Sequence, residues 1–417
     1  MSVFPEQQVR SGLRPSLDQV WKACLTWSHR HDVRAALLAT LALRVVCSSL
    51  AALLTFVVSP AHVPPSFLGK YVINPWLHWD TLWYLAIAEH GYSGPGSTAF
   101  MPLYPLLMRA LGTLLGGNLP LAALVISTCA TFGALLCLHR LVSRWSAVPH
   151  AADWALVTAV MLPVSFFLMA GYSEALFVWL SLATILLALE ERWALVAGVS
   201  ALAALTRHQG VFLPLVFLPG LCFQAREWWR SREQGEPWQD VFHVWFWPLL
   251  AVLAGPATYL LWWLGVVGLW LHAPLPWGPE ILPNGWYLHS AVPGAGIWAN
   301  LVALAQNKVP NPLGLSLPLD TGMAVLAGLG ILLAIRRFPP GLLLYLIACW
   351  CLALLKVQTA GLTISTARYL LPLLPLLLLP AELLAGDHRL LRLAWVGVGG
   401  VLLVFYTWLF AWGVWIA

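Results

Sequence analysis

The sequence predicts an all-α, polytopic membrane protein, and three observations support this fold class. Of the 417 residues, 60% are hydrophobic and only 9% are charged, whereas soluble domains have a charged share of roughly 25%. Apolar runs close to the roughly 20 residues that cross a bilayer recur along the chain. Within lipid, a helix satisfies all the backbone polar groups of such a run. We therefore expect a single transmembrane domain over residues 35–417, preceded by a basic cytoplasmic segment over residues 1–34.

The apolar runs predict eleven spanning helices. Their expected ranges are 35–58, 118–139, 154–171, 174–189, 193–209, 210–225, 244–270, 319–335, 341–357, 369–385 and 393–416. The first run is longer than a signal-peptide core and has no small-residue cleavage site, so we expect it to remain as a signal anchor. Two outer segments, 59–117 and 271–318, are too long for simple turns, and segments of this length usually carry function.

Basic residues give the expected orientation. With the N-terminus in the cytoplasm, 15 of the 22 Lys and Arg residues lie in inner segments, as the positive-inside rule requires. The net charge of +5 is then a property of the topology, and no nucleic-acid partner is predicted. The expected location is the plasma membrane, with both long segments on the extracytoplasmic face. The seven cysteines show neither a disulfide framework nor a zinc-binding spacing.

The first long outer segment is predicted to contain two interfacial helices. Trp79, Trp83 and Ile87 repeat at helical spacing before Gly91, which is typical of a helix that lies in the membrane interface and ends at a glycine. A second amphipathic helix is expected to begin at Pro102. The second long segment is rich in Trp, Pro and Gly, which suits a structure at headgroup depth.

Topology reduces the 17 acidic residues to five outside the cytoplasm. These are Asp80, Glu89, Glu174, Glu280 and Asp320. A carboxylate near the hydrocarbon boundary is costly unless it is paired or functional. Glu174 is held there by a tight turn, where it either satisfies helix-end amides or belongs to a site. Asp80 either caps the first interfacial helix or acts in catalysis, and the two roles are compatible.

Two arginines face the same side as Asp80. Arg207 ends the fifth predicted helix and Arg368 opens the tenth. At helix ends they could snorkel to the interface, but outer arginines are scarce here, which favours phosphate binding through forked, charge-assisted hydrogen bonds. A carboxylate that removes a proton, beside guanidinium groups that hold an anionic leaving group, suits a displacement on a lipid-linked phosphosugar.

A more specific pattern surrounds Asp80. The chain reads His78-Trp79-Asp80-x-x-Trp83-Tyr84-x-x-Ile87-Ala88-x-x-Gly91-Tyr92 and then Phe100-x-Pro102-Leu103-Tyr104-Pro105. This pattern resembles the signature of the PIG-V mannosyltransferase family. Later motifs similar to those of the family follow in the same order, as Tyr172-Ser173-Glu174, Thr206-Arg207-x-x-Gly210 and Arg368-Tyr369. The sequence departs from the family pattern at Met101, where a second aromatic residue is common, and at His208-Gln209, which replace a small polar pair.

The resemblance implies a GT-C-class glycosyltransferase that transfers a sugar, usually mannose, from a polyprenyl phosphate with inversion on the outer or lumenal face. It implies that Asp80 is the general base, and Arg207 and Arg368 are expected to bind the donor phosphate. Possible supporting residues are His78, Trp79, Tyr84, Tyr172, Glu174 and His208. The expected partners are membrane lipids, the polyprenyl-phosphate sugar and a glycan, lipid or protein acceptor. The Ala/Leu-rich composition and the lack of sequons indicate a bacterial member, which argues against a glycosylphosphatidylinositol (GPI) acceptor.

Several alternatives accompany this interpretation. No metal ion is expected, because Asp80 has no second carboxylate two residues on and no His/Cys cluster replaces it. The tryptophans near Asp80 are expected to anchor the chain in the interface rather than stack on a sugar. Arg44, within the first helix, is expected to be a buried structural partner. The alternative function is a transporter or flippase of a lipid-linked sugar or cell-envelope precursor, a class that usually shows internal repeats and broken helices; no repeat is evident in the sequence.

Overall fold

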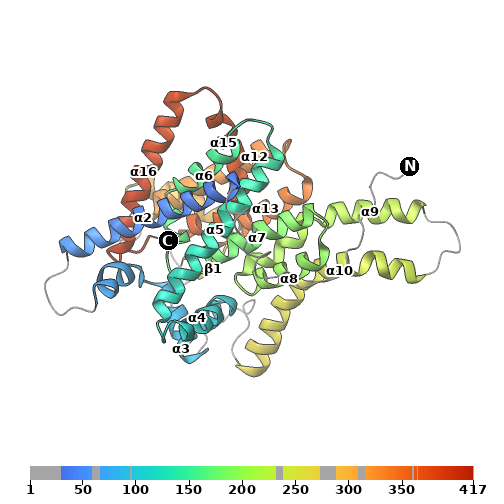
Figure 1. Cartoon of the computed structure of the whole chain (residues 1–417), viewed down its shortest axis with the longest axis horizontal. Helices are drawn as coiled ribbons and strands as arrows, with labels where there is room; N and C mark the ends of the chain where they lie inside the picture. The colour runs from blue at the N-terminus through green and yellow to red at the C-terminus, as the bar shows by residue number, and fades with distance from the viewer. Residues whose placement is uncertain are drawn as a thin grey trace.

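The structure is a computed structural model, and it describes residues 30–58, 66–93, 96–231, 238–272, 288–308, 315–358, 361–363 and 365–416. Most of the predicted cytoplasmic segment 1–34 therefore lies outside the described residues, as does Glu280. The described part is a bundle of helices (Figure 1). One short antiparallel ribbon accompanies them, in which β1 (Leu288–Ser290) pairs with β2 (Lys356–Gln358). This ribbon ties the second long segment to the end of α13 (Pro340–Leu355).

Six helical stretches of the described chain are long and apolar enough to cross a membrane. They are His31–Val57, Leu119–Trp145, His208–Arg230, Val244–Trp270, Ser316–Ala334 and Arg389–Ala411. They belong to α2 (His31–Val58), α5 (Leu119–Trp145), η5 (His208–Val216) with α9 (Leu218–Ser231), α10 (Trp238–Leu260) with η6 (Leu261–Trp270), α12 (Ser316–Ala334) and α16 (Arg389–Ala411). Each of the six overlaps one predicted span, which supports a helical multi-pass membrane protein.

The other five predicted spans coincide with shorter apolar helices. These are α6 (Ala151–Val160), α7 (Glu174–Leu189), α8 (Trp193–Ala204), α13, and the pair η7 (Leu371–Leu377) and α15 (Leu378–Ala385). Five of the eleven predicted crossings therefore correspond to helices that, at 1.5 Å per residue, are too short to cross a bilayer by themselves.

Both helices predicted for the first long segment are present. α3 (Asp80–His90) ends at Gly91, and α4 (Leu103–Leu114) follows Pro102 in the N-cap position. They lie beside each other at the lower edge of Figure 1. Short helical turns precede them, at η1 (Leu68–Ile73), η2 (Asn74–Trp76) and η3 (Ser97–Ala99). The second long segment contains α11 (Ala295–Ala305).

The predicted span 154–171 is interrupted. α6 ends at Val160, and a separate turn, η4 (Ser165–Leu168), follows. Proline in this connection, at Pro163, cannot donate the backbone hydrogen bond that a continuous helix needs. The Arg44 guanidinium on α2 donates to the carbonyls of Met169 at 2.8 Å and Leu124 at 3.1 Å. Arg44 thus has the structural role expected of it, because it satisfies backbone acceptors near the interruption.

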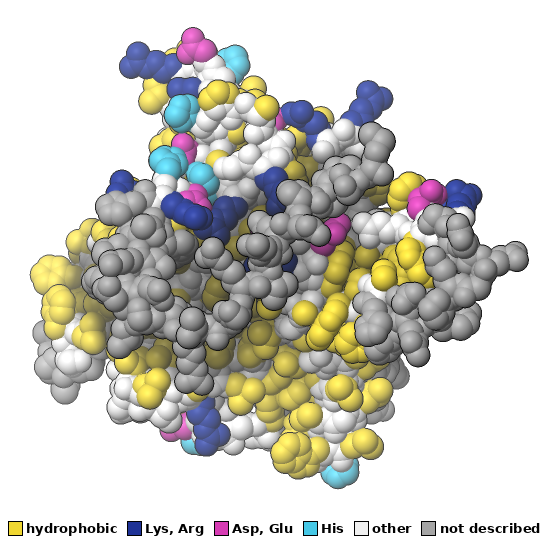
Figure 2. All heavy atoms as spheres, turned by 45° about the vertical axis from the view of Figure 1, so that its right-hand side comes forward, with side chains coloured by type: hydrophobic (Ala, Val, Ile, Leu, Met, Phe, Trp, Pro, Cys, Tyr) yellow, Lys and Arg dark blue, Asp and Glu magenta, His cyan; other side chains and the backbone are white. Residues whose placement is uncertain are grey.

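The outer surface of the bundle is strongly apolar. Leu253 on α10, Leu326 on α12 and Val401 on α16 are 59–69% exposed. Figure 2 shows a broad hydrophobic area, with most Lys, Arg and His side chains gathered toward the upper edge of the view. Exposed apolar surface of this extent is expected where a protein faces lipid.

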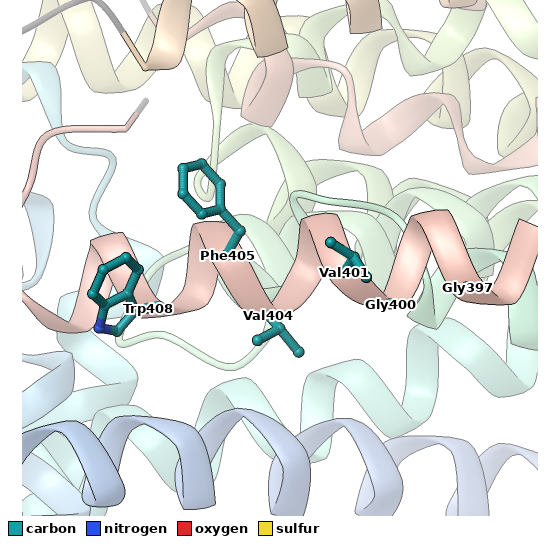
Figure 3. A pocket seen from close by; sticks show the side chains of 6 residues that line it. All are labelled: Gly397, Gly400, Val401, Val404, Phe405 and Trp408. Atoms are coloured by element: carbon teal, nitrogen blue, oxygen red, sulfur yellow. The ribbon is translucent and has the colours of Figure 1, made fainter.

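An open apolar groove lies along α16. It is lined by Gly397, Gly400, Val401, Val404, Phe405 and Trp408, which all project from this helix (Figure 3). None of these lining side chains is charged, so the groove offers no group for acid, base or phosphate chemistry.

Candidate functional site

Four charged side chains from distant segments meet in one buried cluster, which we call the charged cluster: Asp80, Glu174, Arg207 and Arg368. Asp80 begins α3, Glu174 begins α7, Arg207 lies between α8 and η5, and Arg368 is on α14 (Thr366–Tyr369). Their exposed fractions are only 2–9%. The structure thus brings together the three residues that the sequence singled out, with Glu174 as a fourth member.

Ion pairs connect the members of the charged cluster in a chain. Arg368 Nη1 lies 2.6 Å from Asp80 Oδ2, and Arg368 Nε lies 3.4 Å from Glu174 Oε1. Arg207 Nη1 lies 2.7 Å from the same Glu174 oxygen. Among the described residues, Asp80 Oδ1 and Glu174 Oε2 have no hydrogen-bond partner. Buried oxygens without a partner are rare and costly, so these two acceptor atoms are candidates for contact with a substrate.

The backbone turns sharply before Asp80. Trp79 occupies the N-cap position of α3 with φ 53° and ψ −114°, a conformation that costs energy for a residue with a Cβ. Trp79 rather than Asp80 is the N-cap residue, and its side chain makes no capping hydrogen bond. Thr81 closes the turn by donating from Oγ1 to the Trp76 carbonyl at 3.1 Å. The Asp80 carboxylate is left to face Arg368.

Gly171 allows the start of α7 to approach α3. A Cβ at Gly171 would lie 2.8 Å from Thr81 Cγ2, closer than packed carbon atoms come. Ser173 continues this contact, because its Oγ accepts hydrogen bonds from Tyr84 OH at 2.7 Å and from Arg207 Nη1 at 3.3 Å. The tight turn that precedes Glu174 therefore holds this carboxylate between the two arginines.

Arg207 stands where the chain folds back on α8. Its φ and ψ are −153° and 152°, an extended conformation between α8 and η5. Gly210 packs directly on the end of α8, since a Cβ there would lie 2.5 Å from the Ala204 nitrogen. This contact explains why a glycine stands three residues after the arginine, and it directs the guanidinium inward.

An aromatic ring is shared by the two arginines. Tyr369 lies below both guanidinium groups, with its centroid 4.8 Å from Arg207 Cζ and 5.4 Å from Arg368 Cζ. Tyr172 lies 5.3 Å from Arg368 Cζ. Distances under about 6 Å allow cation–π attraction. Gln209 fixes Tyr369 by donating from Nε2 to its carbonyl at 2.7 Å, so a residue that departs from the family pattern has a positioning contact here.

Asp320 supports the short helix that carries Arg368. Ser365, before this helix, has φ 59°, and Asp320 Oδ1 accepts the Ala367 N–H at 2.7 Å. Asp320 is fully buried, and its Oδ2 has no hydrogen-bond partner in the described part of the chain. Sequence reasoning placed Asp320 among the outer acids but assigned it no role, because no local pattern links residues 47 positions apart.

Only some of the predicted supporting residues adjoin the charged cluster. Tyr84, Tyr172 and Glu174 do so through the contacts above. The other three side chains contact different groups: His78 Nε2 lies 3.3 Å from the Ala411 carbonyl, Trp79 packs edge-on against Trp415, and His208 Nδ1 lies 3.2 Å from Tyr259 OH. These imidazoles and this indole therefore pack outside the charged cluster.

Burial and charge act in opposite directions on the charged cluster. Burial raises the pKa of Asp80 above its ordinary value, and Arg368 offsets part of that rise. For the arginines, burial disfavours the charge, but Glu174 and Asp80 outweigh it, so the pKa of Arg207 is raised and that of Arg368 is raised well above the ordinary value. The arginines therefore stay protonated. Both carboxylates face guanidinium groups, so a divalent cation here would lie close to two positive charges.

Comparisons with known proteins agree with the sequence motif. The sequence model of the mannosyltransferase (PIG-V) family matches residues 33–253, which is more than half of the 417 residues. The matched range contains Asp80, Glu174 and Arg207, while Arg368 lies beyond it. No solved structure matches the chain.

Curated relatives match over part of their length. The human GPI alpha-1,6-mannosyltransferase 2 is 33% identical over 136 residues, 30% of this chain and 28% of that protein. The mouse protein of the same name is 34% identical over 197 residues, 44% of this chain and 39% of its own. The GPI mannosyltransferase 2 of Yarrowia lipolytica is 31% identical over 157 residues, 36% and 41% of the two chains. The chain thus matches less than half the length of these relatives, and their eukaryotic sources give no support to the expected bacterial origin. Since its sequence matches the family over more than half its length, the chain belongs to the mannosyltransferase (PIG-V) family.

Proposed function

We propose that this chain is an inverting mannosyltransferase that moves mannose from a polyprenyl-phosphate donor to an acceptor hydroxyl outside the cytoplasm. The observation that carries the proposal is the charged cluster. In it, a buried carboxylate with one unpartnered oxygen stands beside two arginines that remain charged. These are the groups that a displacement at a sugar phosphate requires.

In the proposed reaction, the acceptor oxygen forms a bond to C1 of the mannose while the bond from C1 to the phosphate oxygen breaks. The acceptor proton passes to Asp80 Oδ1, and the electron pair of the broken bond leaves with the polyprenyl phosphate. A raised pKa makes Asp80 a stronger base than an ordinary carboxylate, which improves proton transfer near neutral pH.

Arg207 and Arg368 are proposed to hold the departing phosphate. Without donor they are paired with Glu174 and Asp80, so an incoming phosphate competes with these carboxylates. When Arg368 turns toward the phosphate, Asp80 loses its counter-ion and becomes more basic. Since the charged cluster is 2–9% exposed, substrates reach it only when the surrounding residues move aside.

The remaining details extend the same proposal. We place the reaction in a single GT-C-like transmembrane domain over residues 35–417, in the plasma membrane, with the charged cluster on the extracytoplasmic face. Membrane lipids surround this domain. The acceptor class that we favour is a glycolipid hydroxyl, because the matched relatives are named for GPI. The sequence argument against a GPI acceptor rested on a bacterial source, which the comparisons do not support.

The direct test is turnover of radiolabelled polyprenyl-phosphomannose by membranes that contain the Asp80→Asn variant. We expect loss of transfer with normal membrane insertion. Retained turnover would exclude Asp80 as the base. Glu89→Gln, on the exposed side of the same helix, is the matched control and should transfer normally.

A second candidate, a transporter or flippase of a lipid-linked precursor, has one observation in its favour. Interrupted helices occur between α6 and α7 and between α8 and α9, and broken helices are common in transporters. Lipid-translocation assays in liposomes distinguish the two functions. A flippase should move its lipid with Asp80→Asn as well as with the unaltered chain, and should form no mannosylated product.

A further inference from the structure

A second polar cluster lies far from the charged cluster and plays no part in the proposed reaction. It contains His31 at the start of α2, His139 near the end of α5, and His150 and Asp153 at the start of α6. Along α5, His139 follows Ala123, which packs beside Gly171, by 139 − 123 = 16 residues. At 1.5 Å per residue this separation is about 24 Å.

The three histidines converge on one carboxylate. Asp153 Oδ1 lies 3.3 Å from His139 Nε2 and 3.7 Å from His31 Nε2. Asp153 Oδ2 lies 3.4 Å from His150 Nδ1. The ligand atoms of His31, His139 and Asp153 all lie within 4.8 Å of one another. Four nitrogen and oxygen ligands at about 2.0–2.1 Å from a tetrahedral metal ion lie about 3.3–3.4 Å apart, so these separations are close to those of a metal site.

From this geometry we propose that His31, His139 and Asp153 bind one divalent transition-metal ion, with zinc as the favoured ion. Imidazole nitrogens with one carboxylate are ligands that suit zinc. Three protein ligands leave the fourth tetrahedral position to a water molecule. His150, which lies 3.4 Å from Asp153 Oδ2, would hold this carboxylate in place as a hydrogen-bond partner of a ligand.

Two features around the four residues fit a metal site. His139 places Nδ1 3.5 Å from Ser143 Oγ, on the side away from Asp153, and a partner for the second ring nitrogen is the usual way of orienting a metal-bound imidazole. His150 has φ 62°, in the left-handed region. This conformation is uncommon for a residue with a side chain, and it lets His150 contact Asp153 only three residues later.

Arg140, the residue after His139, has its own carboxylate partner. Arg140 Nε pairs with Asp32 Oδ2 at 2.8 Å, so its charge is balanced by a carboxylate other than Asp153. An ion can approach from the side of His31 and His150, whose side chains are 72% and 79% exposed. A bound ion would join α2, α5 and α6, which also meet through packing and, for α2 and α5, through the Arg140–Asp32 ion pair. It would thereby stabilise the end of the bundle remote from the charged cluster.

The test uses the full chain, purified in detergent without an oligohistidine tag and stripped with a chelator. Zinc affinity and stoichiometry are measured by competition with a chromophoric chelator, and cobalt absorption reports the coordination geometry. The ligand variants, which remove a ligand or the partner that holds one, are His31→Ala and His150→Ala, because both side chains are exposed and can be removed without disturbing the core. The matched control is His90→Ala. This exposed histidine also lies near a carboxylate, with Nε2 3.6 Å from Glu89, but it belongs to no group of metal-binding side chains in the described part of the chain.

We expect one zinc ion per chain and a tetrahedral cobalt spectrum. Each ligand variant should weaken zinc binding by at least about tenfold, and His90→Ala should leave it unchanged. Zinc should raise the unfolding temperature of the unaltered chain but not that of the His31→Ala/His150→Ala double variant. Substoichiometric binding, or equal losses in the ligand variants and the control, would overturn the proposal and leave a hydrogen-bonded group of histidines around Asp153.

Discussion

Replacing Asp80 with Asn is the most informative perturbation of the charged cluster. The change keeps the shape of the side chain and removes its negative charge. A general base typically contributes about 10²–10⁴-fold to rate, equivalent to about 2.7–5.4 kcal/mol at roughly 1.36 kcal/mol per factor of ten. We therefore expect transfer to fall by about 10²–10⁴-fold.

The cost of Asp80→Asn to folding should be smaller than the loss of a whole buried ion pair, which is about 3–5 kcal/mol. The Asn oxygen can still accept from Arg368, and Arg368 keeps its second carboxylate, Glu174, at 3.4 Å. The assay is radiolabelled mannose transfer per unit of folded protein, with Glu89→Gln as the control. Transfer by Asp80→Asn within about threefold of the unaltered chain would refute the assignment of the base.

Other predictions concern the neighbours of Asp80. Arg368→Lys keeps the charge but loses the fork, so it should raise the donor KM more than Arg207→Lys does, because Arg368 contacts both carboxylates; equal effects in donor-titration kinetics would contradict this. Asp320→Ala should lower transfer by freeing the helix that carries Arg368, and Asp320→Asn, whose oxygen can still accept the Ala367 N–H, should restore most of it. If Asn does no better than Ala, the hydrogen bond is not the reason. Since burial raises the pKa of Asp80 above 3.8 and the base must be ionised, transfer should fall as the pH drops through that raised value; a pH–rate profile without this acidic limb would argue against the mechanism.

The sequence predicted the charged cluster better than it predicted the path of the chain. Charge is energetically costly in an apolar chain, so charged residues are few. The candidates for a site are therefore easily recognised as Asp80, Glu174, Arg207 and Arg368. Their convergence follows from that cost, since buried charges seek partners. The contact between Asp320 and α14 could not be predicted, because it depends on the tertiary fold.

Interrupted helices were the main feature that the sequence did not reveal. Hydropathy is continuous over the predicted range 154–171, although α6 ends at Val160. Pro163 lies in this interruption, and Arg44 on α2 binds the Met169 carbonyl that follows it. A hydropathy average over the range detects neither effect. The histidines around Asp153 were missed for a similar reason, because metal-site spacings are recognised within short motifs, whereas His31 and His139 are 108 positions apart.

Two acids are paired with two arginines, so the side chains of the charged cluster have a formal charge of zero. In the proposed reaction, the donor phosphate competes for the guanidinium groups with carboxylates that remain beside them. After transfer, Glu174 competes with the anionic product for the arginines, and Asp80 pairs with Arg368 again once it has released the proton that it took from the acceptor. The charged cluster thus contains anions that can displace the product, and its resting state returns when the product has left and Asp80 has lost its proton. This competition weakens donor binding but favours release of the product phosphate, and so favours turnover.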